Sequence, residues 1–238
     1  MKLSTIITAY DCHEITKIHA RECFNSSLIP DEVIIVNDGG TPDLKEKLLE
    51  LKKPIKYARI EQDILWNYTG ACNLGACLAR GEYLAFEDND NIPHKEFYEK
   101  AIDILDENPE VGVVFGKIRH DVSVNDLEKS VESWNVIGSR GPNRGSYIIR
   151  RDIYFKLKGQ DEQFAGRYGW MYYDWRRRLL SITKFSQRGI FYYVVEGQSK
   201  ISHKTDPKNY YIYHQGCKEK KIQSPIGILN FSFFYETL

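Results

Sequence analysis

Short apolar runs alternate with helical patterns along the first half of the chain. The runs at 3–10 (LSTIITAY), 32–38 (EVIIVND) and 55–61 (IKYARIE) have the β-branched composition of strands. The segments that separate them, one running through Arg21 and one over 44–53 (LKEKLLELKK), show helical patterns. Such alternation predicts an α/β fold with a mainly parallel, doubly wound sheet flanked by helices.

The same alternation continues to the middle of the chain. A helix is expected to begin near Thr69, and EYLAFED (82–88) then follows as a strand. The segment 94–105 places apolar residues at helical spacing before Asn108-Pro109 stops it. The run VGVVFGKI (111–118) is predicted to be a strand buried on both faces.

The second half is less regular. Beyond Asp121 the polar, Gly-containing stretch IGSRGPNRGS suggests an active-site loop rather than a domain linker, because regular structure resumes directly after it. We therefore expect one domain over residues 1–238. Further elements are expected as a strand or helix at 146–157, a helix at 169–180 and a strand at 189–197. The apolar tail 224–234 is open to three interpretations: a closing helix, a docking surface or a link to more chain.

Charge and cysteine content exclude several classes of protein. Lys plus Arg total 33 and Asp plus Glu total 33, so no broad field favours nucleic acid or an anionic membrane. The five cysteines are an odd number without a CxxC pair, which favours a reducing compartment. No run approaches the roughly 20 apolar residues of a membrane span. We expect a soluble, cytoplasmic protein with no transmembrane segment and no nucleic-acid partner.

Polar residues follow three of the predicted strands. Open parallel sheets bind ligands at the carboxyl ends of their strands, so chemistry is expected there. The residues concerned are Thr8, Ala9, Tyr10 and Asp11 after the first strand, Asn37, Asp38, Gly39 and Gly40 after the second, and Asp88, Asn89 and Asp90 after the strand 82–88.

Each acidic position has two interpretations. Asp38 before two glycines is either a turn former or a ligand-binding residue, since Asp readily bonds its own backbone. Asp88 and Asp90 place two carboxylates together, and their repulsion needs either solvent or a cation to offset it. The residues alone leave both choices open.

The motifs, taken together, resemble a known family. TAYD (8–11), IIVNDGG (34–40) and NYTGACNLGACLARGEYLAFEDND (67–90) resemble the nucleotide-binding half of family 2-type glycosyltransferases, with its TxYN, VVDDGS, NxGxxxARNxG, GEY and DxD pattern. In the second half, GSYIIRRDIYFKLKGQDEQF is similar to the stretch that leads to the family's GGFDE segment, and RYGWMYYDWRRRLL to its GWGxED acceptor motif. The resemblance implies a single GT-A domain with a nucleotide-sugar half at 1–120 and an acceptor half with the C-terminal tail at 121–238.

Four positions depart from the family pattern. Asn37 replaces the first acid of DDGS, and Cys72 replaces the arginine of ARN. Gln160 stands at the phenylalanine of GGFDE, and Tyr173 at the glutamate of the ED motif. The segment therefore lacks the acceptor-binding carboxylate of the family, while Asp174 is retained.

The resemblance also implies roles for individual residues. Asp38 would accept from the donor base, Tyr10 and Asp11 would line the base and ribose pocket, and Asp88 would face the ribose or a metal-bound water. Asp90 would coordinate a divalent ion, Mn²⁺ or Mg²⁺, which suits carboxylate and imidazole ligands. His203 is either a further metal ligand or a structural histidine. The donor-binding set is Thr8, Ala9, Tyr10, Asp11, Asp38, Asn67, Gly70, Asn73, Asp88 and Asn89, and the metal set is Asp88, Asp90 and His203.

Asp174 is the candidate catalytic residue. By resemblance it would be the general base of an inverting transfer, while its helical pattern alone indicates a first-turn acid favoured by the helix dipole. The aromatic residues around it are open to two interpretations, stacking on an acceptor sugar or packing in the core.

The resemblance implies a metal-dependent hexosyltransferase of glycan biosynthesis. It would move a sugar from a nucleotide-diphosphate donor to a hydroxyl acceptor such as a glycan, and the family mainly uses UDP-sugars. One alternative is an inactive relative that binds a sugar nucleotide. A sugar-phosphate nucleotidyltransferase is a weaker alternative, because TAYDCHEITK has no Gly-rich, basic phosphate loop.

Overall fold

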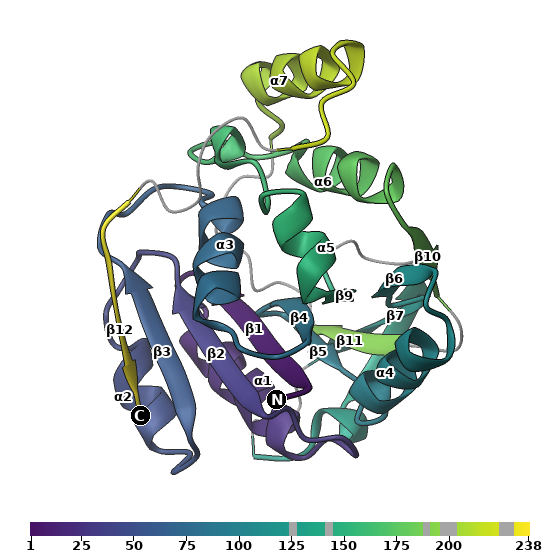
Figure 1. Cartoon of the computed structure of the whole chain (residues 1–238). Helices are drawn as coiled ribbons and strands as arrows, with labels where there is room; N and C mark the ends of the chain where they lie inside the picture. The colour runs from purple at the N-terminus through teal and green to yellow at the C-terminus, as the bar shows by residue number, and fades with distance from the viewer. Residues whose placement is uncertain (124–127, 141–144, 188–190, 196–203, 224–230) are drawn as a thin grey trace.

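The core of the molecule is a large, mainly parallel sheet covered by helices on both faces (Figure 1). The computed structural model describes residues 1–123, 128–140, 145–187, 191–195, 204–223 and 231–238. Within these residues the larger sheet has the strand order β10-β6-β9-β4-β1-β2-β3-β12. Its strands are β1 (Leu3–Ala9), β2 (Glu32–Asn37), β3 (Ile55–Ile60), β4 (Tyr83–Asp88), β6 (Val111–Phe115), β9 (Tyr147–Arg150), β10 (Lys184–Ser186) and β12 (Phe233–Thr237).

Strands β3, β2, β1 and β4 are parallel neighbours, whereas β9 runs antiparallel between β4 and β6. Every residue of β1 and β2 is buried, because helices cover both faces of the sheet at its centre. The predicted fold class, a mainly parallel sheet flanked by helices, is confirmed.

The helices pack on the sheet in two layers. One apolar layer forms under α1, α2 and α4, and the other under α3, α5 and α6. The helices are α1 (His13–Phe24), α2 (Leu44–Leu49), α3 (Tyr68–Leu78), α4 (Phe97–Glu107), α5 (Arg151–Lys156), α6 (Met171–Leu180) and α7 (Pro207–Lys218), with 3₁₀ turns at Val131–Ser133 and Glu162–Phe164. In the described part of the chain, none of these helices combines the length and the apolar character needed to cross a membrane.

A smaller sheet has the order β5-β11-β7-β8. Its strands are β5 (Asn91–Pro93), β7 (Ile118–Ser123), β8 (Asn135–Arg140) and β11 (Phe191–Val195). The sequence analysis expected one strand over 111–118, but the chain leaves the large sheet after Phe115 and enters the small one at Ile118. Because β5 directly follows Asp88-Asn89-Asp90, its pairing with β11 anchors the end of that loop.

The apolar tail ends in a strand. Residues 224–230 lie outside the described part of the chain, and β12 then pairs antiparallel with β3 at the edge of the large sheet. Helix α7 lies beyond α6, at the top of Figure 1 and farthest from the sheet.

The close packing of α3 on β1 requires a glycine. A Cβ on Gly75 would lie 2.3 Å from Cγ2 of Ile6, which is fully buried. We expect Gly75→Ala to lower the free energy of unfolding by about 1–3 kcal/mol, because this overpacking exceeds the gain in helix propensity. Chemical denaturation measures the change. The matched control is Gly138→Ala in β8, where the added Cβ would meet Asp121 at an ordinary 3.5 Å. Equal stability of the two variants would contradict the packing argument.

Candidate functional site

The carboxyl ends of β1, β2 and β4 lie side by side. In the strand register Thr8 pairs with Asp88, and Ala9 pairs with Asn37. The backbone N–H of Asp38 also donates to the carbonyl of Ala9 over 2.8 Å. The three motifs that follow these strands are therefore brought to one edge of the sheet.

The turn after β2 is held from two sides. Arg59 on β3 donates to the carbonyls of Gly39, Gly40 and Thr41 at 3.4, 2.7 and 3.0 Å. Asp11 accepts from the backbone N–H of Thr41 at 2.7 Å and from its hydroxyl at 3.0 Å. Both glycines have positive φ, 89° and 64°, which a turn of this shape requires. The carboxylate of Asp11 thus braces the turn.

Asp38 lies at the base of this edge. It is buried, and in the described part of the chain its Oδ1 has no hydrogen-bond donor. Burial raises its pKa well above the usual value, the charge of Asp63 adds to this, and Asn67 opposes it. The pKa of Tyr10 is raised by burial and by the charge and hydrogen bond of Asp63. A donor group on a ligand would satisfy the oxygen that Asp38 leaves open.

Asp88 is surrounded by polar groups. The Tyr172 hydroxyl lies 3.2 Å from both of its carboxylate oxygens, and Asn91 donates to Oδ2 over 3.2 Å. Burial, followed by the charge of Asp90, raises the pKa of Asp88 to about 7. The backbone at Gly145 approaches so closely that a Cβ there would lie 2.0 Å from Oδ2 of Asp88. Asp88 is therefore packed against β5, α6 and the chain before β9.

Helix α1 supports the same loop from the other face of the sheet. The ring of His19 lies with Nδ1 3.2 Å from the carbonyl of Asn89, so Nδ1 carries the proton and donates. Asn89 in turn donates to the hydroxyl of Thr16 over 3.4 Å. Burial lowers the pKa of His19 to about 4, which keeps the ring neutral. Sequence reasoning missed both supports, because a histidine and a threonine inside a helix carry no motif.

Two carboxylates at this edge suit a divalent cation. The charge of Asp90 adds to the effect of burial on the pKa of Asp88, and a cation between the two carboxylates would offset their repulsion. Oxygen ligands of this kind fit Mg²⁺ or Mn²⁺. Among the described residues no group of three potential metal ligands occurs. The predicted ligand His203 lies outside the described residues.

The start of α3 lies near the Asp38 turn, since the side chain of Asn67 forms a hydrogen bond with Asp38. A Cβ on Gly70 would meet Oδ1 of Asn67 at 2.3 Å and the ring of Phe231 at 2.5 Å. The aromatic ring just before β12 therefore lies directly on α3.

Asn73 is bound entirely within the protein. Its Oδ1 accepts from the Tyr154 hydroxyl at 2.6 Å and from Gln160 N–H at 2.9 Å. Its Nδ2 donates to the Gln160 carbonyl at 3.0 Å and to Glu162 at 2.8 Å. These bonds use all four positions of the amide, so Asn73 joins α3 to the segment 160–162.

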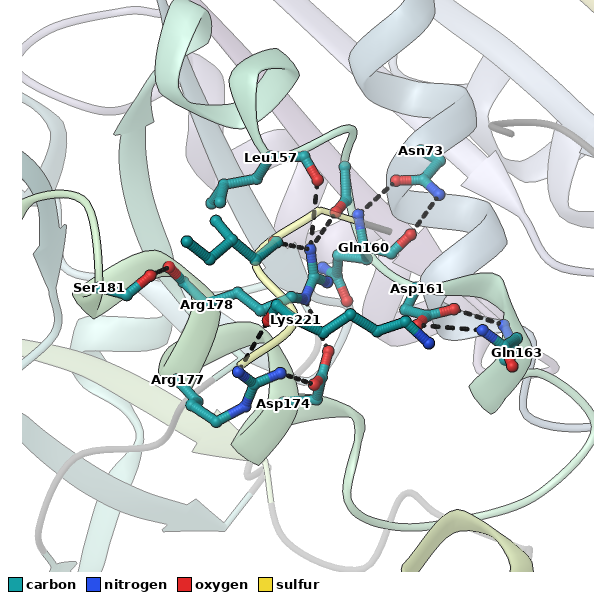
Figure 2. Close-up of polar contacts among 12 residues, drawn as sticks. Asn73, Leu157, Gln160, Asp161, Gln163, Asp174, Arg177, Arg178, Ser181 and Lys221 are labelled. Carbon is teal, nitrogen blue, oxygen red and sulfur yellow. Dashed lines mark hydrogen bonds and ion pairs between the residues drawn. The ribbon is translucent and has the colours of Figure 1, made fainter. Parts of the chain in front are cut away.

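Asp174 is buried on α6 and bound by two arginines (Figure 2). Arg177 donates to its Oδ1 over 2.8 Å, and Arg178 donates to its Oδ2 over 2.7 Å. Gly216 of α7 lies beside the pair, since a Cβ there would be 3.2 Å from the Arg177 guanidinium. The arginines three and four residues after Asp174 thus hold its carboxylate in one orientation.

Arg178 makes hydrogen bonds to three other segments around α6. It is almost fully buried, and its Nη1 donates to the carbonyls of Leu157, Gly159 and Ile222 at 3.3, 2.9 and 3.5 Å (Figure 2). It therefore ties α6 both to the loop after α5 and to the chain after α7. Its position in a run of three arginines carries no signal of this burial.

The aromatic residues of this segment separate into two groups. Trp175 is buried in the core with Tyr154 and Tyr147, while Tyr172 turns to Asp88. Trp170 and Tyr173 lie on the outer side, and Tyr173 is half exposed.

The sequence profile of glycosyl transferase family 2 matches residues 4–174, so the chain belongs to this family. An uncharacterised glycosyltransferase of Rickettsia conorii is 31% identical over 139 residues, which is 56% of this chain and 21% of that protein. The poly-β-1,6-N-acetyl-D-glucosamine synthase of Staphylococcus epidermidis is 24% identical over 57% of this chain and 34% of its own length. The chain thus spans about a fifth to a third of these curated relatives.

Solved structures show the same GT-A fold. TarS of S. aureus, residues 1–349 in complex with UDP-GlcNAc, aligns with a TM-score of 0.69 at 15% identity, covering 95% of this chain and 68% of that one. The mannosyltransferase of Pyrobaculum calidifontis in complex with GDP-Man and Mn²⁺ aligns with a TM-score of 0.61 at 13% identity, covering 90% and 68%.

The buried arginine should matter more than its neighbour. We expect Arg178→Met to lower the free energy of unfolding by about 3 kcal/mol, because Oδ2 of the buried Asp174 and three carbonyls lose the arginine that donates to them. Urea denaturation measures this. Arg176→Met is the control: Arg176 is only partly buried and lies over the Phe115 and Phe185 rings at 6.0 and 5.7 Å. A loss as large in the control would show that these bonds of Arg178 are not the cause.

Proposed function

We propose that the chain transfers a hexosyl group from a nucleotide-diphosphate sugar, UDP-linked by family preference, to a hydroxyl of a glycan acceptor. One observation carries the proposal: Asp38 and the Asp88-Asn89-Asp90 loop lie at the same edge of a GT-A sheet. The structural neighbours that carry UDP-GlcNAc or GDP-Man support a nucleotide-sugar donor. All five cysteines are free thiols, which supports a reducing compartment such as the cytoplasm.

The donor base would be held by Asp38, whose open Oδ1 is suited to an N–H of a pyrimidine. Thr8, Ala9 and Tyr10 would line the same pocket, with Asn67 and Gly70 at the start of α3. Asp11 and Asn73 would support the donor site indirectly. Asp11 bonds to the turn after β2, and Asn73 holds α3 against segment 160–162.

Asp88 and Asp90 would hold the divalent cation, with Asn89 shaping the loop between them. A bound Mn²⁺ or Mg²⁺ would supply stabilisation of the negative charge on the leaving diphosphate. The Tyr172 hydroxyl keeps Asp88 oriented toward this edge.

Asp174 would act as the general base of an inverting displacement. We call the sheet edge that carries Asp38 and residues 88–90 the donor edge. Tyr172, two residues before Asp174 in the first turn of α6, contacts Asp88, so this end of α6 lies close to the donor edge. Arg177 and Arg178 fix the carboxylate, and the lone pairs that they leave would accept the proton of the acceptor hydroxyl.

A second candidate function is sugar-nucleotide binding without turnover. It is favoured by one observation: both oxygens of Asp174 are already bound to guanidinium groups, and Tyr173 replaces the family's glutamate. Mass spectrometry of reactions with UDP-GlcNAc, UDP-glucose and GDP-mannose separates the two functions, because only the transferase releases nucleoside diphosphate in a catalytic amount.

Removal of the predicted metal ligand tests the donor site. We expect Asp90→Ala to lose the Mn²⁺-dependent binding of UDP, because a diphosphate without its cation is repelled by Asp88. Titration calorimetry with UDP, with and without Mn²⁺, measures the affinity. Asp103→Ala on the exposed side of α4 removes the same charge away from the edge and should bind UDP as the wild type does. Unchanged Mn²⁺-dependent affinity in Asp90→Ala would remove this residue from the metal site.

A test of Asp174 as the general base must separate the loss of its carboxylate from the loss of its ion pairs. We expect Asp174→Asn to reduce sugar transfer on the order of 10²-fold or more, the scale of a positioned base, while UDP affinity stays within about twofold. Steady-state kinetics at saturating donor, well below the melting temperature, measure the loss. Arg177→Met breaks one of the same ion pairs but keeps the carboxylate, so it should retain most of the rate. Equal losses in the two variants would assign Asp174 a structural role.

A further inference from the structure

Five aromatic rings gather where α7 meets the start of α6. The centroid of the Trp170 ring lies 5.0 Å from Tyr210, 5.1 Å from Tyr213, 5.3 Å from Tyr173 and 5.8 Å from His214. Tyr210 and His214, one helical turn apart, are in contact at 4.0 Å. We call these five side chains the α7 aromatic face.

This face is open to solvent. Tyr173 and Tyr210 are each 49% exposed, and Trp170, Tyr213 and His214 are partly buried beneath them. Phenol hydroxyls and an imidazole are distributed among the rings, and none of the five side chains is aliphatic. Exposed clusters of this composition are typical of binding surfaces, because each ring offers a flat apolar side and a polar edge.

The backbone beneath the face is held in a fixed shape. Trp170 has a φ of 70°, a left-handed conformation that is unfavourable for a bulky residue and that occurs most often at functional sites. Asn209 on α7 is fully buried and donates to the carbonyls of Phe164, Arg167 and Gly169 at 3.3, 3.0 and 3.0 Å. Helix α7 is therefore locked to the turn that carries Trp170, and the rings are positioned before any ligand arrives.

The face is connected to the proposed transfer site through the first turn of α6. Two residues after Trp170, the hydroxyl of Tyr172 bonds to Asp88 at the donor edge. Helix α7 itself lies beyond residues 4–174, the part of the chain that matches the family. The face therefore shares the first turn of α6 with Tyr172, which contacts Asp88, and extends onto an element that the family match does not include.

We propose that the α7 aromatic face binds the acceptor as a saccharide chain, several sugar units long, with sugar rings stacked on Tyr210 and Trp170. The inference rests on the proposed function and names its acceptor class. Sugar rings have an apolar face that stacks on aromatic rings and hydroxyls that bond to their polar edges, which matches the composition of this face. A chain lying along it would extend from the start of α6 onto α7.

Direct glycan binding tests the proposal without relying on turnover. The probes are immobilised oligosaccharides of four or more units, including β-1,6- and β-1,4-linked N-acetylglucosamine, mannan fragments and acidic glycans, together with the single sugars. We expect the wild type to bind at least one chain and Tyr210→Ala to bind it roughly three- to tenfold more weakly, the value of one aromatic contact. Tyr211→Ala is the matched control: Tyr211 is 66% exposed but is rotated by about 100° on the same helix. This variant should bind as the wild type does, and single sugars should not distinguish the three proteins.

Two results would overturn the inference. One is that no chain in the panel distinguishes Tyr210→Ala from Tyr211→Ala. The other is that light scattering shows a wild-type dimer that Tyr210→Ala dissolves, which would make the face a contact between copies of the chain. Thermal shifts with UDP-GlcNAc and Mn²⁺ separate this inference from the proposed function, since Tyr210→Ala should keep the shift of the wild type. If the wild type itself shows no shift with any nucleotide sugar, the proposed function fails, whereas glycan binding still decides the role of the face.

Discussion

The structure depends on the segment 157–160, which connects its two halves. Two buried side chains, Asn73 and Arg178, bind the backbone of this segment. Asn73 on α3 binds both backbone groups of Gln160, and Arg178 on α6 binds the carbonyls of Leu157 and Gly159. Both side chains are almost fully buried, so each bond that is lost leaves a polar group without water. These hydrogen bonds, together with the apolar cluster that α3 and α6 share, fix the relative position of the two helices.

Several carboxyl groups are buried at or next to the donor edge, and their burial lowers the stability of the fold. Burial raises the pKa of Asp38, Glu87 and Asp88, and a hydrogen bond with Ser146 opposes this increase for Glu87. Such groups destabilise the fold unless a proton, a cation or a ligand offsets their charge. The apolar layers under the flanking helices supply the stability that makes this arrangement tolerable, as is usual where a scaffold supports a binding site.

The strands and helices of the first half were predictable because their signals are local: apolar periodicity, and Asn108-Pro109 at the end of α4. The transfer of the chain between sheets after Phe115 was not, since one continuous apolar run serves both strands. The motifs identified which residues gather at the edge of the sheet. They could not identify His19 or the partners of Asn73 and Arg178, because those contacts join residues far apart in the sequence. The donor-binding and catalytic roles remain predictions.

The turn after β2 illustrates what such distant contacts do. Arg59 and Asp11 hold Gly39, Gly40 and Thr41 through backbone bonds that exist without any ligand. Two glycines would otherwise sample many conformations, and each residue ordered on binding would cost about 1–2 kcal/mol in entropy. Here that ordering is complete when the chain has folded. Discrimination among small molecules at this turn would therefore depend on the enthalpy of their contacts with an already ordered backbone. The turn could not rearrange locally to accommodate a molecule of the wrong shape.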